Sequence, residues 1–261
     1  MFDPTADFKF ATPKIADKFG CETSESYLKG SMEIFLEEMN RSGITKGVVP
    51  FRKIENGDNT FLLNLMNQYP GVFFGVPNIN PLDIGAIDEI RTYVKDGPYV
   101  GIIMEHGLQQ NPLYIDDQRS YEVYDYCEKE EIPIIFTFGS LTVPSLDYMN
   151  PMRVANIAEM FPRLKMILAH GGWPYVTEMI YLAFKYDNLY LSPDMYALHT
   201  AGHQSYFDAA NYMLQDKIIF GSAYPTVDMQ NSVKFYLSKL NDNVKDKIMY
   251  ENAAQILGLI E

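Results

Sequence analysis

The strongest constraint on the fold is a strict alternation of short apolar runs with helix-like segments along the whole chain. Eight apolar runs have the length of buried parallel strands, and they cover residues 2–6, 46–51, 72–77, 100–105, 132–138, 165–169, 189–192 and 217–221. Amphipathic segments follow them, over residues 24–39, 59–69, 82–94, 117–130, 151–161, 175–186, 205–214 and 226–237. Eight strands alternating with eight helices predict an α/β fold, a (β/α)8 TIM barrel rather than an open doubly wound sheet.

The remainder of the chain adds little to this plan. Residues 243–257 predict extra C-terminal helices beyond the eighth unit. No Gly/Ser-rich linker, long charge block or internal repeat divides the sequence. We therefore expect residues 1–261 to form one TIM-barrel domain.

Charge and cysteine content narrow the classes of function. The chain has 21 basic and 34 acidic side chains and a net charge of −13, which argues against binding to nucleic acid or to an anionic membrane. Charges interrupt every apolar run well before the length of a membrane span, and the N-terminus lacks the pattern of a signal peptide. Cys21 and Cys127 are not spaced as a disulfide framework or a zinc site. A soluble, cytoplasmic protein is expected.

Polar residues fall where the strands of such a barrel end, and that end of a TIM barrel carries the chemistry. They are Thr5, Asp7, Arg52, Asn78, Asn80, Glu105, His106, Thr137, His170, Asp194, Ser222 and Tyr224. Glu105 and His170 directly end apolar strands, so each must be paired, hydrated or used. For Arg52 and the two asparagines a turn role competes with ligand contact. Asp194 also fits a helix cap, and His106 also fits the rim.

His199 and His203 are four residues apart, a spacing that places both on one face of a helix. The segment lacks the glutamate of the H-E-x-x-H motif and contains Gly202. It is a weak metal signal, and a loop at the edge of a pocket is the competing interpretation.

Two segments carry a family resemblance. Residues 165–174, KMILAHGGWP, and 219–225, IFGSAYP, are similar to the strand-six histidine segment and the strand-eight G-S-D-x-P segment of the amidohydrolase-related (β/α)8 barrels. Residues 100–105, 132–139 and 250–259 resemble the fourth strand, the fifth strand and the C-terminal ending of the same family. This family includes enzymes like aminocarboxymuconate-semialdehyde decarboxylase and pyrone-dicarboxylate lactonase, so the resemblance implies a barrel that hydrolyses or decarboxylates small molecules.

The family's metal ligands are mostly replaced. Where similar enzymes have the two histidines of a D-x-H-x-H strand, this chain has Thr5 and Asp7; Thr137 stands in place of the strand-five histidine and Ala223 in place of the strand-eight aspartate. Only His170 keeps its family identity. Because a catalytic zinc needs three protein ligands, we expect neither a metal nor another cofactor; the alternative is a metal held by Asp7 and His170 with Glu105 as the added ligand.

The leading functional hypothesis is a metal-independent hydrolase, resembling a lactonase, or a carboxy-lyase acting on a small carboxylated or cyclic carbonyl compound. His170 would be the general acid or base, with Asp7 or Asp194 orienting it and Glu105 as a further catalytic carboxylate. The expected substrate-binding residues are Arg52, His106, Thr137, Trp173, Tyr224 and Asn78. The alternative is a non-catalytic relative that binds a metabolite or a protein partner. A homodimer surface rich in Tyr and Met fits both hypotheses.

Overall fold

The wall of the barrel consists of parallel strands arranged in chain order. The structure, a computed structural model, describes residues 12–51, 59–139 and 143–260. β1 (Gly47–Pro50) pairs with β2 (Phe73–Val76), and β3 (Ile102–Met104), β4 (Ile134–Thr137), β5 (Met166–Ala169) and β6 (Leu189–Ser192) form a four-stranded sheet in that order. A parallel bridge from Asn78 to Ile103 links the two sheets.

Two predicted strands differ from this regular pattern. The strand expected over residues 217–221 pairs with its neighbour only through an isolated bridge between Leu191 and Ile218. The strand expected over residues 2–6 lies outside the described residues. The other six predicted strands are confirmed: β6 has the predicted bounds, and the other five are one to three residues shorter than predicted.

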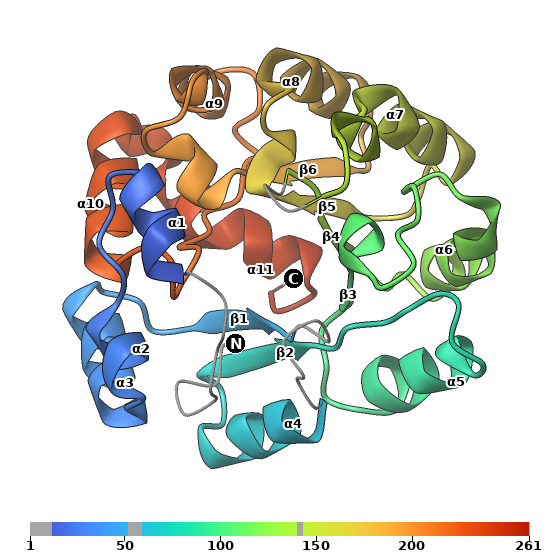
Figure 1. The fold of residues 1–261 in the computed structure, drawn as a ribbon, viewed down its shortest axis with the longest axis horizontal. Helices are drawn as coiled ribbons and strands as arrows, with labels where there is room; N and C mark the ends of the chain where they lie inside the picture. The colour runs from blue at the N-terminus through green and yellow to red at the C-terminus, as the bar shows by residue number, and fades with distance from the viewer. Residues whose placement is uncertain (1–11, 52–58, 140–142, 261) are drawn as a thin grey trace.

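Helices surround the strands (Figure 1). They are α1 (Thr12–Lys18), α2 (Glu25–Lys29), α3 (Met32–Arg41), α4 (Asn59–Gln68), α5 (Ala86–Ile90), α6 (Tyr121–Lys129), α7 (Pro151–Met160), α8 (Val176–Lys185), α9 (His203–Asn211), α10 (Met229–Lys239) and α11 (Asn252–Ile256). A π-helical turn extends α5 through Arg91–Lys95, and another, Lys247–Glu251, leads into α11. None of the described helices has the length and apolar character needed to cross a membrane.

Local sequence explains where the helices depart from expectation. The single helix predicted over residues 24–39 is two helices, because Gly30 adopts the left-handed conformation at φ 60° and ends α2. Ser31 then caps α3, its hydroxyl accepting a hydrogen bond from the Ile34 amide at 3.3 Å. The helix expected from residue 82 begins at Ala86, since Asn80 and Asp83 form a turn before it. α1 was not predicted.

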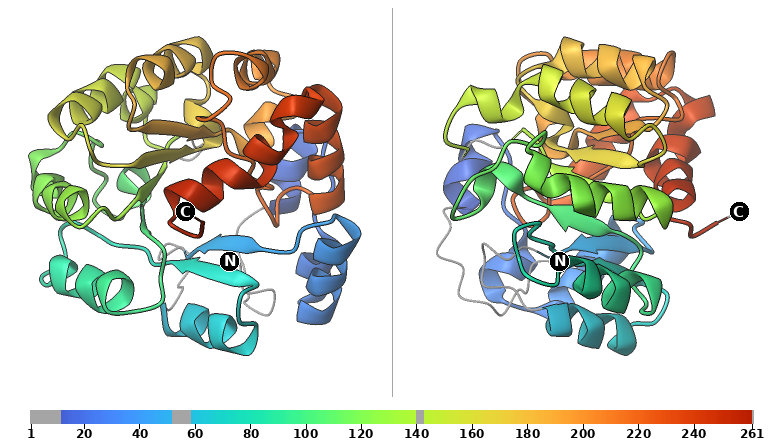
Figure 2. Two further views of the ribbon diagram at one scale, coloured as in Figure 1. Left: turned by 180° about the vertical axis from the view of Figure 1, so that it is seen from behind. Right: turned by 90° about the vertical axis from the view of Figure 1, so that its right-hand side faces the viewer.

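The barrel interior is filled by branched apolar side chains in one layer. Its members are Val76, Ile103, Ile135, Ile167 and Ile219, closed from below by Ile256 and Leu257 of the C-terminal segment. Figure 2 shows α11 across this end of the barrel when the molecule is seen from behind. Side chains alternate across a strand, so the residues two positions further on face the same interior. That next layer contains Asn78, Glu105, Thr137, Ala169 and Gly221, together with Ser192, which lies two positions after Tyr190 at the edge of the same cluster; it forms the floor of the mouth.

Candidate active site

The clearest pair of chemically competent side chains at the mouth is His170 and Asp194. His170 follows β5 and Asp194 follows β6, two neighbouring strands paired in register from Met166 with Leu189. Oδ2 of Asp194 lies 2.6 Å from Nδ1 of His170 and also accepts the His170 backbone amide at 3.1 Å. Nε2 of the imidazole makes no hydrogen bond to a described residue. With Nδ1 held by the carboxylate, Nε2 is the nitrogen that can exchange a proton with a ligand.

Unusual backbone conformations hold this pair. His170, Asp194 and Ala223, at the ends of three successive strand positions, have φ values of 70°, 46° and 54°. A left-handed conformation of a non-glycine residue costs roughly 1–3 kcal/mol, and such costs concentrate at functional sites. Glu131 is the fourth non-glycine residue with positive φ in the described part of the chain. Three of four therefore gather at one end of the barrel.

Neighbouring glycines allow the backbone to close tightly around the pair. At Gly139, φ is 131° and an added Cβ would lie 2.9 Å from Cβ of His170. At Gly221 an added Cβ would lie 2.8 Å from Oγ of Ser192 and 3.1 Å from Cβ of Asp194. Both positions accept glycine alone without local rearrangement.

The Asp194 carboxylate lies in an environment of low polarity. The residue is 6% exposed, and Oδ1 is buried without a hydrogen-bond partner among the described residues. The Tyr236 hydroxyl donates to the Asp194 backbone oxygen at 3.2 Å. Burial, and then the Asp194 charge, raise the pKa of Tyr206 and of Tyr236, so both phenols stay neutral. A desolvated carboxylate interacts strongly with the imidazole that it contacts.

Glu105 forms a second polar group inside the barrel. Its side chain is buried, with Oε2 accepting a hydrogen bond from Nδ2 of Asn78 at 2.8 Å and Oε1 facing Oγ1 of Thr137 at 3.5 Å. The three residues come from the ends of β2, β3 and β4, which explains how positions far apart in sequence meet. Of the expected site residues, the structure thus joins His170 with Asp194, and Glu105 with Asn78 and Thr137.

His106 points away from the mouth. Because Glu105 faces the barrel interior, the next side chain faces the helices. Nε2 of His106 lies 3.0 Å from Oγ of Ser120 and 2.8 Å from the Tyr124 hydroxyl, which itself donates to the Ile115 carbonyl at 2.7 Å. Desolvation lowers the pKa of His106 to about 4, so the ring is neutral at physiological pH. Alternation along the strand was the signal that could have predicted this placement.

An aromatic group covers one side of His170. Tyr196, which the sequence analysis did not select, contacts the His170 ring edge-on at 5.3 Å between centroids. Trp173 stacks on Tyr196 at 5.2 Å, and its indole nitrogen donates to the Ala201 carbonyl at 3.3 Å. Phe19, just after α1, contacts Tyr196 from another side at 5.3 Å. Trp173 is thus next to the histidine, one ring removed.

The remaining expected residues lie elsewhere. Tyr224 packs on Phe35 of α3 and its hydroxyl is 2.9 Å from Oγ of Ser26, so it faces the α2–α3 hairpin. Asn80 has the turn role, since its side chain bonds to Asp83 at 2.7 Å and accepts the Leu82 amide at 3.1 Å. Thr5, Asp7 and Arg52 lie outside the described residues.

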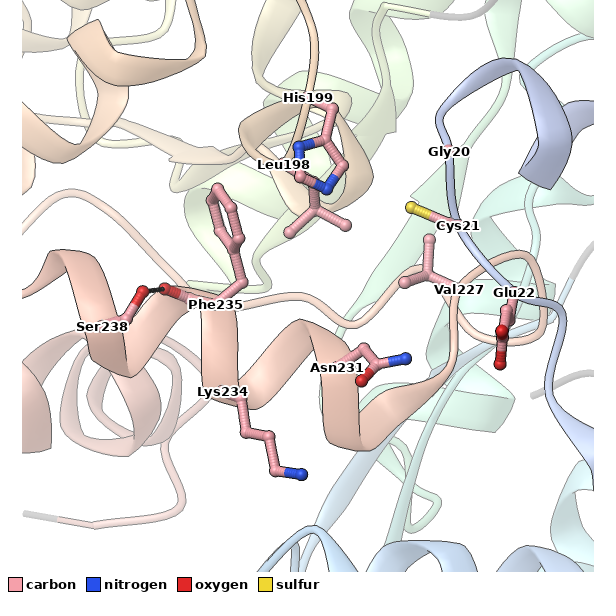
Figure 3. A pocket seen from close by; sticks show the side chains of 10 residues that line it. All are labelled: Gly20, Cys21, Glu22, Leu198, His199, Val227, Asn231, Lys234, Phe235 and Ser238. Atoms are coloured by element: carbon pink, nitrogen blue, oxygen red, sulfur yellow. Dashed lines mark hydrogen bonds between the residues drawn. The ribbon is translucent and has the colours of Figure 1, made fainter.

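A pocket of about 470 Å³ lies between the segment after α1, the loop after β6 and α10 (Figure 3). It is bordered by Cys21 and its neighbours, by Leu198 and His199 of the loop after β6, and by α10. Of the expected catalytic residues that the structure describes, Glu105, His170 and Asp194 do not line it. His203 is not among its lining residues, and Nδ1 of His203 bonds to the Thr200 carbonyl at 2.8 Å, whereas His199 does border the pocket. Among the described residues, no group of three or more His, Cys, Asp or Glu side chains that could hold a metal ion includes these two histidines.

The described side chains do not fit a catalytic divalent metal. Residues 12–51, 59–139 and 143–260 contain no group of three or more His, Cys, Asp or Glu side chains placed to hold an ion. At the positions of the usual family ligands, Thr137 is a neutral hydroxyl and Ala223 has no donor. Neutral hydroxyls are poor ligands for zinc, which takes thiolates, imidazoles and carboxylates.

The fold and the pair at its mouth define a TIM-barrel protein with a hydrogen-bonded histidine–aspartate pair at the ends of its strands. The chain belongs to the amidohydrolase family, whose model matches residues 19–259. A comparison with curated proteins finds no match.

Solved structures agree with this assignment. An uncharacterized TIM-barrel protein from Bordetella bronchiseptica is 31% identical, with 95% of this chain and 89% of that one covered and a TM-score of 0.90. A probable 2-pyrone-4,6-dicarboxylic acid hydrolase from Acinetobacter baumannii is 13% identical, covering 88% and 89%, with a TM-score of 0.68. A dihydroxybenzoic acid decarboxylase from a Polaromonas species, with bound manganese, is 16% identical, covering 95% and 93%, with a TM-score of 0.66. At such identities the last two show the fold alone.

Proposed function

We propose that the chain is an enzyme that hydrolyses or decarboxylates a small carboxylated or cyclic carbonyl compound without the metal of its relatives. The observation that carries the proposal is the 2.6 Å contact between Nδ1 of His170 and Oδ2 of Asp194. An imidazole oriented by a buried carboxylate is a general acid–base group, and the carboxylate stabilises the imidazolium when the proton is held.

The same dyad serves either reaction. In lactone hydrolysis, neutral His170 takes a proton from water at Nε2 while the water oxygen bonds to the carbonyl carbon, and the proton then passes to the leaving alkoxide. In decarboxylation, loss of carbon dioxide leaves an electron pair on carbon, and Nε2–H of the imidazolium protonates that carbon. Asp194 keeps the ring in the same orientation in both cases.

Small residues beside the dyad support a ligand at this position. Ala169, Ser192, Gly221 and Ala223 end the strands next to His170, and all four are only half-buried. Chains of the family usually have an aspartate at the position of Ala223, so the larger aspartate side chain is missing here. Thr137, also half-buried, completes the row. We propose that the substrate carbonyl or carboxylate is bound here, with Arg52 as its expected cationic partner.

A non-catalytic binding protein is the second candidate. The observation that favours it is Ala223 itself, because the usual strand-eight base is lost and His170 alone must supply proton transfer. The two candidates differ in what they predict for a bound ligand: an enzyme converts it, and a binding protein releases it unchanged.

A thermal-shift screen tests the ligand class. Lactones and small aromatic or unsaturated carboxylates are the two arms, and a ligand that binds the native state raises the melting temperature with concentration. The expected result is a hit in at least one arm that is weakened in His170→Gln. No stabilisation in either arm would contradict the proposed substrate class.

A further inference from the structure

The pocket in Figure 3 is large enough for a small molecule, and the proposed chemistry at His170 does not use it. Its volume is about 470 Å³, within the range of small-molecule sites. Leu198 and Val227, which are 3% and 1% exposed, and the half-buried ring of Phe235 form an apolar part of the lining. A ligand can therefore bury an apolar group here.

Charged and polar side chains follow one another along one edge of this pocket. The Glu22 carbonyl accepts the Asp228 amide at 2.8 Å, which fixes Glu22 beside the N-terminus of α10. Asn231 and Lys234 line the pocket three and six residues after Asp228. Because positions three apart share one side of a helix, the edge runs from a carboxylate, past an amide, to an ammonium group. In the view of Figure 3, Asn231 lies between the other two side chains.

These three side chains are exposed and are not engaged by the protein. Among the described residues, Glu22 and Lys234 form no ion pair, and the side-chain amide of Asn231 forms no hydrogen bond. Six residues of an α-helix rise about 9 Å, so the carboxylate and the ammonium group belong to opposite ends of the edge. A matching ligand carries two opposite charges several ångströms apart, with a hydrogen-bonding group between them.

The chemistry of a dipeptide matches this arrangement. The ammonium and carboxylate groups of a free amino acid share one carbon atom and lie too close together to reach both ends. An extended dipeptide separates its charged ends by roughly 7 Å and has a peptide group between them. The side-chain amide of Asn231 can both donate to that group and accept from it. A ligand with one charge would leave either Glu22 or Lys234 without a partner.

We propose that the pocket binds an apolar dipeptide with free termini. Its ammonium group pairs with Glu22, its peptide group bonds to Asn231, its carboxylate pairs with Lys234, and its side chains cover the apolar lining. Asp228 caps α10 by accepting the Asn231 backbone amide at 2.9 Å, so a second carboxylate lies at the ammonium end. The proposal does not depend on a catalytic role of His170, which does not line the pocket.

Alkylation of Cys21 measures occupancy of the pocket. Cys21 borders the pocket and is partly exposed, whereas Cys127 is 0% exposed, so iodoacetamide should label Cys21 alone in the native protein. The probe is leucyl-leucine at pH 7, where its α-ammonium group is charged. The labelling rate, followed by mass spectrometry, should fall as the dipeptide concentration rises. A rate that no concentration of leucyl-leucine changes would overturn the proposal.

Three related compounds test each contact on the unaltered protein. N-acetyl-leucyl-leucine lacks the ammonium group, leucyl-leucinamide lacks the carboxylate, and leucine lacks the peptide group. The first two should need roughly two- to fivefold higher concentrations for half-protection of Cys21, the size expected for the loss of one exposed ion pair. Leucine should also protect more weakly. Equal half-protection by leucyl-leucine and any of the three analogues would overturn the assignment of a dipeptide.

A variant at the carboxylate end tests the role of Lys234. Lys234→Gln should bind leucyl-leucine and leucyl-leucinamide equally, because the carboxylate has lost its partner. The matched control is Lys129→Gln, which removes the same charge from α6, on the opposite side of the barrel from α10 in Figure 1. It should keep the preference for the free carboxylate. A preference that persists in Lys234→Gln would overturn the proposal.

Discussion

Protonation of His106 should make the stability of this protein fall steeply between pH 7 and pH 5. The ring is buried between the end of β3 and α6, and desolvation lowers its pKa from 6.5 to about 4. The unfolded chain therefore binds a proton near pH 6.5 that the folded chain does not accept until about pH 4. The contribution of the neutral His106 ring to the free energy of unfolding is fully present above pH 6.5 and is lost as the pH falls toward 4.

The shift gives the size of the effect. At 1.36 kcal/mol per pKa unit, the full difference amounts to about 3 kcal/mol, of which about 2 kcal/mol is lost between pH 7 and pH 5. Carboxylates also titrate in this range, so the free energy of unfolding must be compared with that of a variant lacking the imidazole. Urea unfolding of the wild type and of His106→Gln, at both pH values, isolates the contribution of His106.

Between pH 7 and pH 5, the free energy of unfolding should fall by about 2 kcal/mol less in His106→Gln than in the wild type. At pH 7 the variant should itself be less stable than the wild type, because Tyr124 and Ser120 lose a hydrogen-bond partner. Equal losses in the two proteins would refute the argument. They would mean that the ring is accessible to water and able to face a ligand, as the sequence analysis expected.

Two further predictions concern the site itself. Gly139→Ala should lower the free energy of unfolding by roughly 2–3 kcal/mol, because φ is 131° and the new methyl would press on His170. The control Gly43→Ala, with φ 71° and open space around it, should lower it by only about 1 kcal/mol. Chemical denaturation measures both variants, and equal losses would contradict the close approach at Gly139. Protein purified without chelator should contain well under one equivalent of zinc, iron or manganese by elemental analysis, and a stoichiometric metal would show that residues outside the described part complete a ligand set.

The alternation of apolar runs and helices was enough to predict the barrel, because each unit is a local pattern. Two errors came from residues whose conformation overrides the pattern. Gly30 divides the first predicted helix, and the apolar periodicity on both sides of it gave no sign of the break. α1 has no apolar stripe of its own that the sequence would reveal; Ala16 within it and Phe19 just beyond it are buried only because the barrel lies beneath them.

The position of the site was predictable, but its pairing was not. Sequence alone left Asp7 and Asp194 as carboxylates that could orient His170, with Glu105 as a further catalytic carboxylate. The choice of Asp194 depends on left-handed backbone at both residues of the pair, which no local pattern specifies. Glu105 instead bonds to Asn78, a contact made because β2 and β3 are neighbours in the barrel.

The most direct test of the central claim is turnover of a ligand found by the thermal-shift screen, measured for the wild type and for His170→Gln in the presence of a chelator. The account predicts full activity of the wild type with chelator, and a kcat for His170→Gln lower by roughly 10²- to 10⁴-fold, the range that general acid–base catalysis supplies. Unchanged turnover by His170→Gln, or wild-type activity that the chelator abolishes, would contradict it.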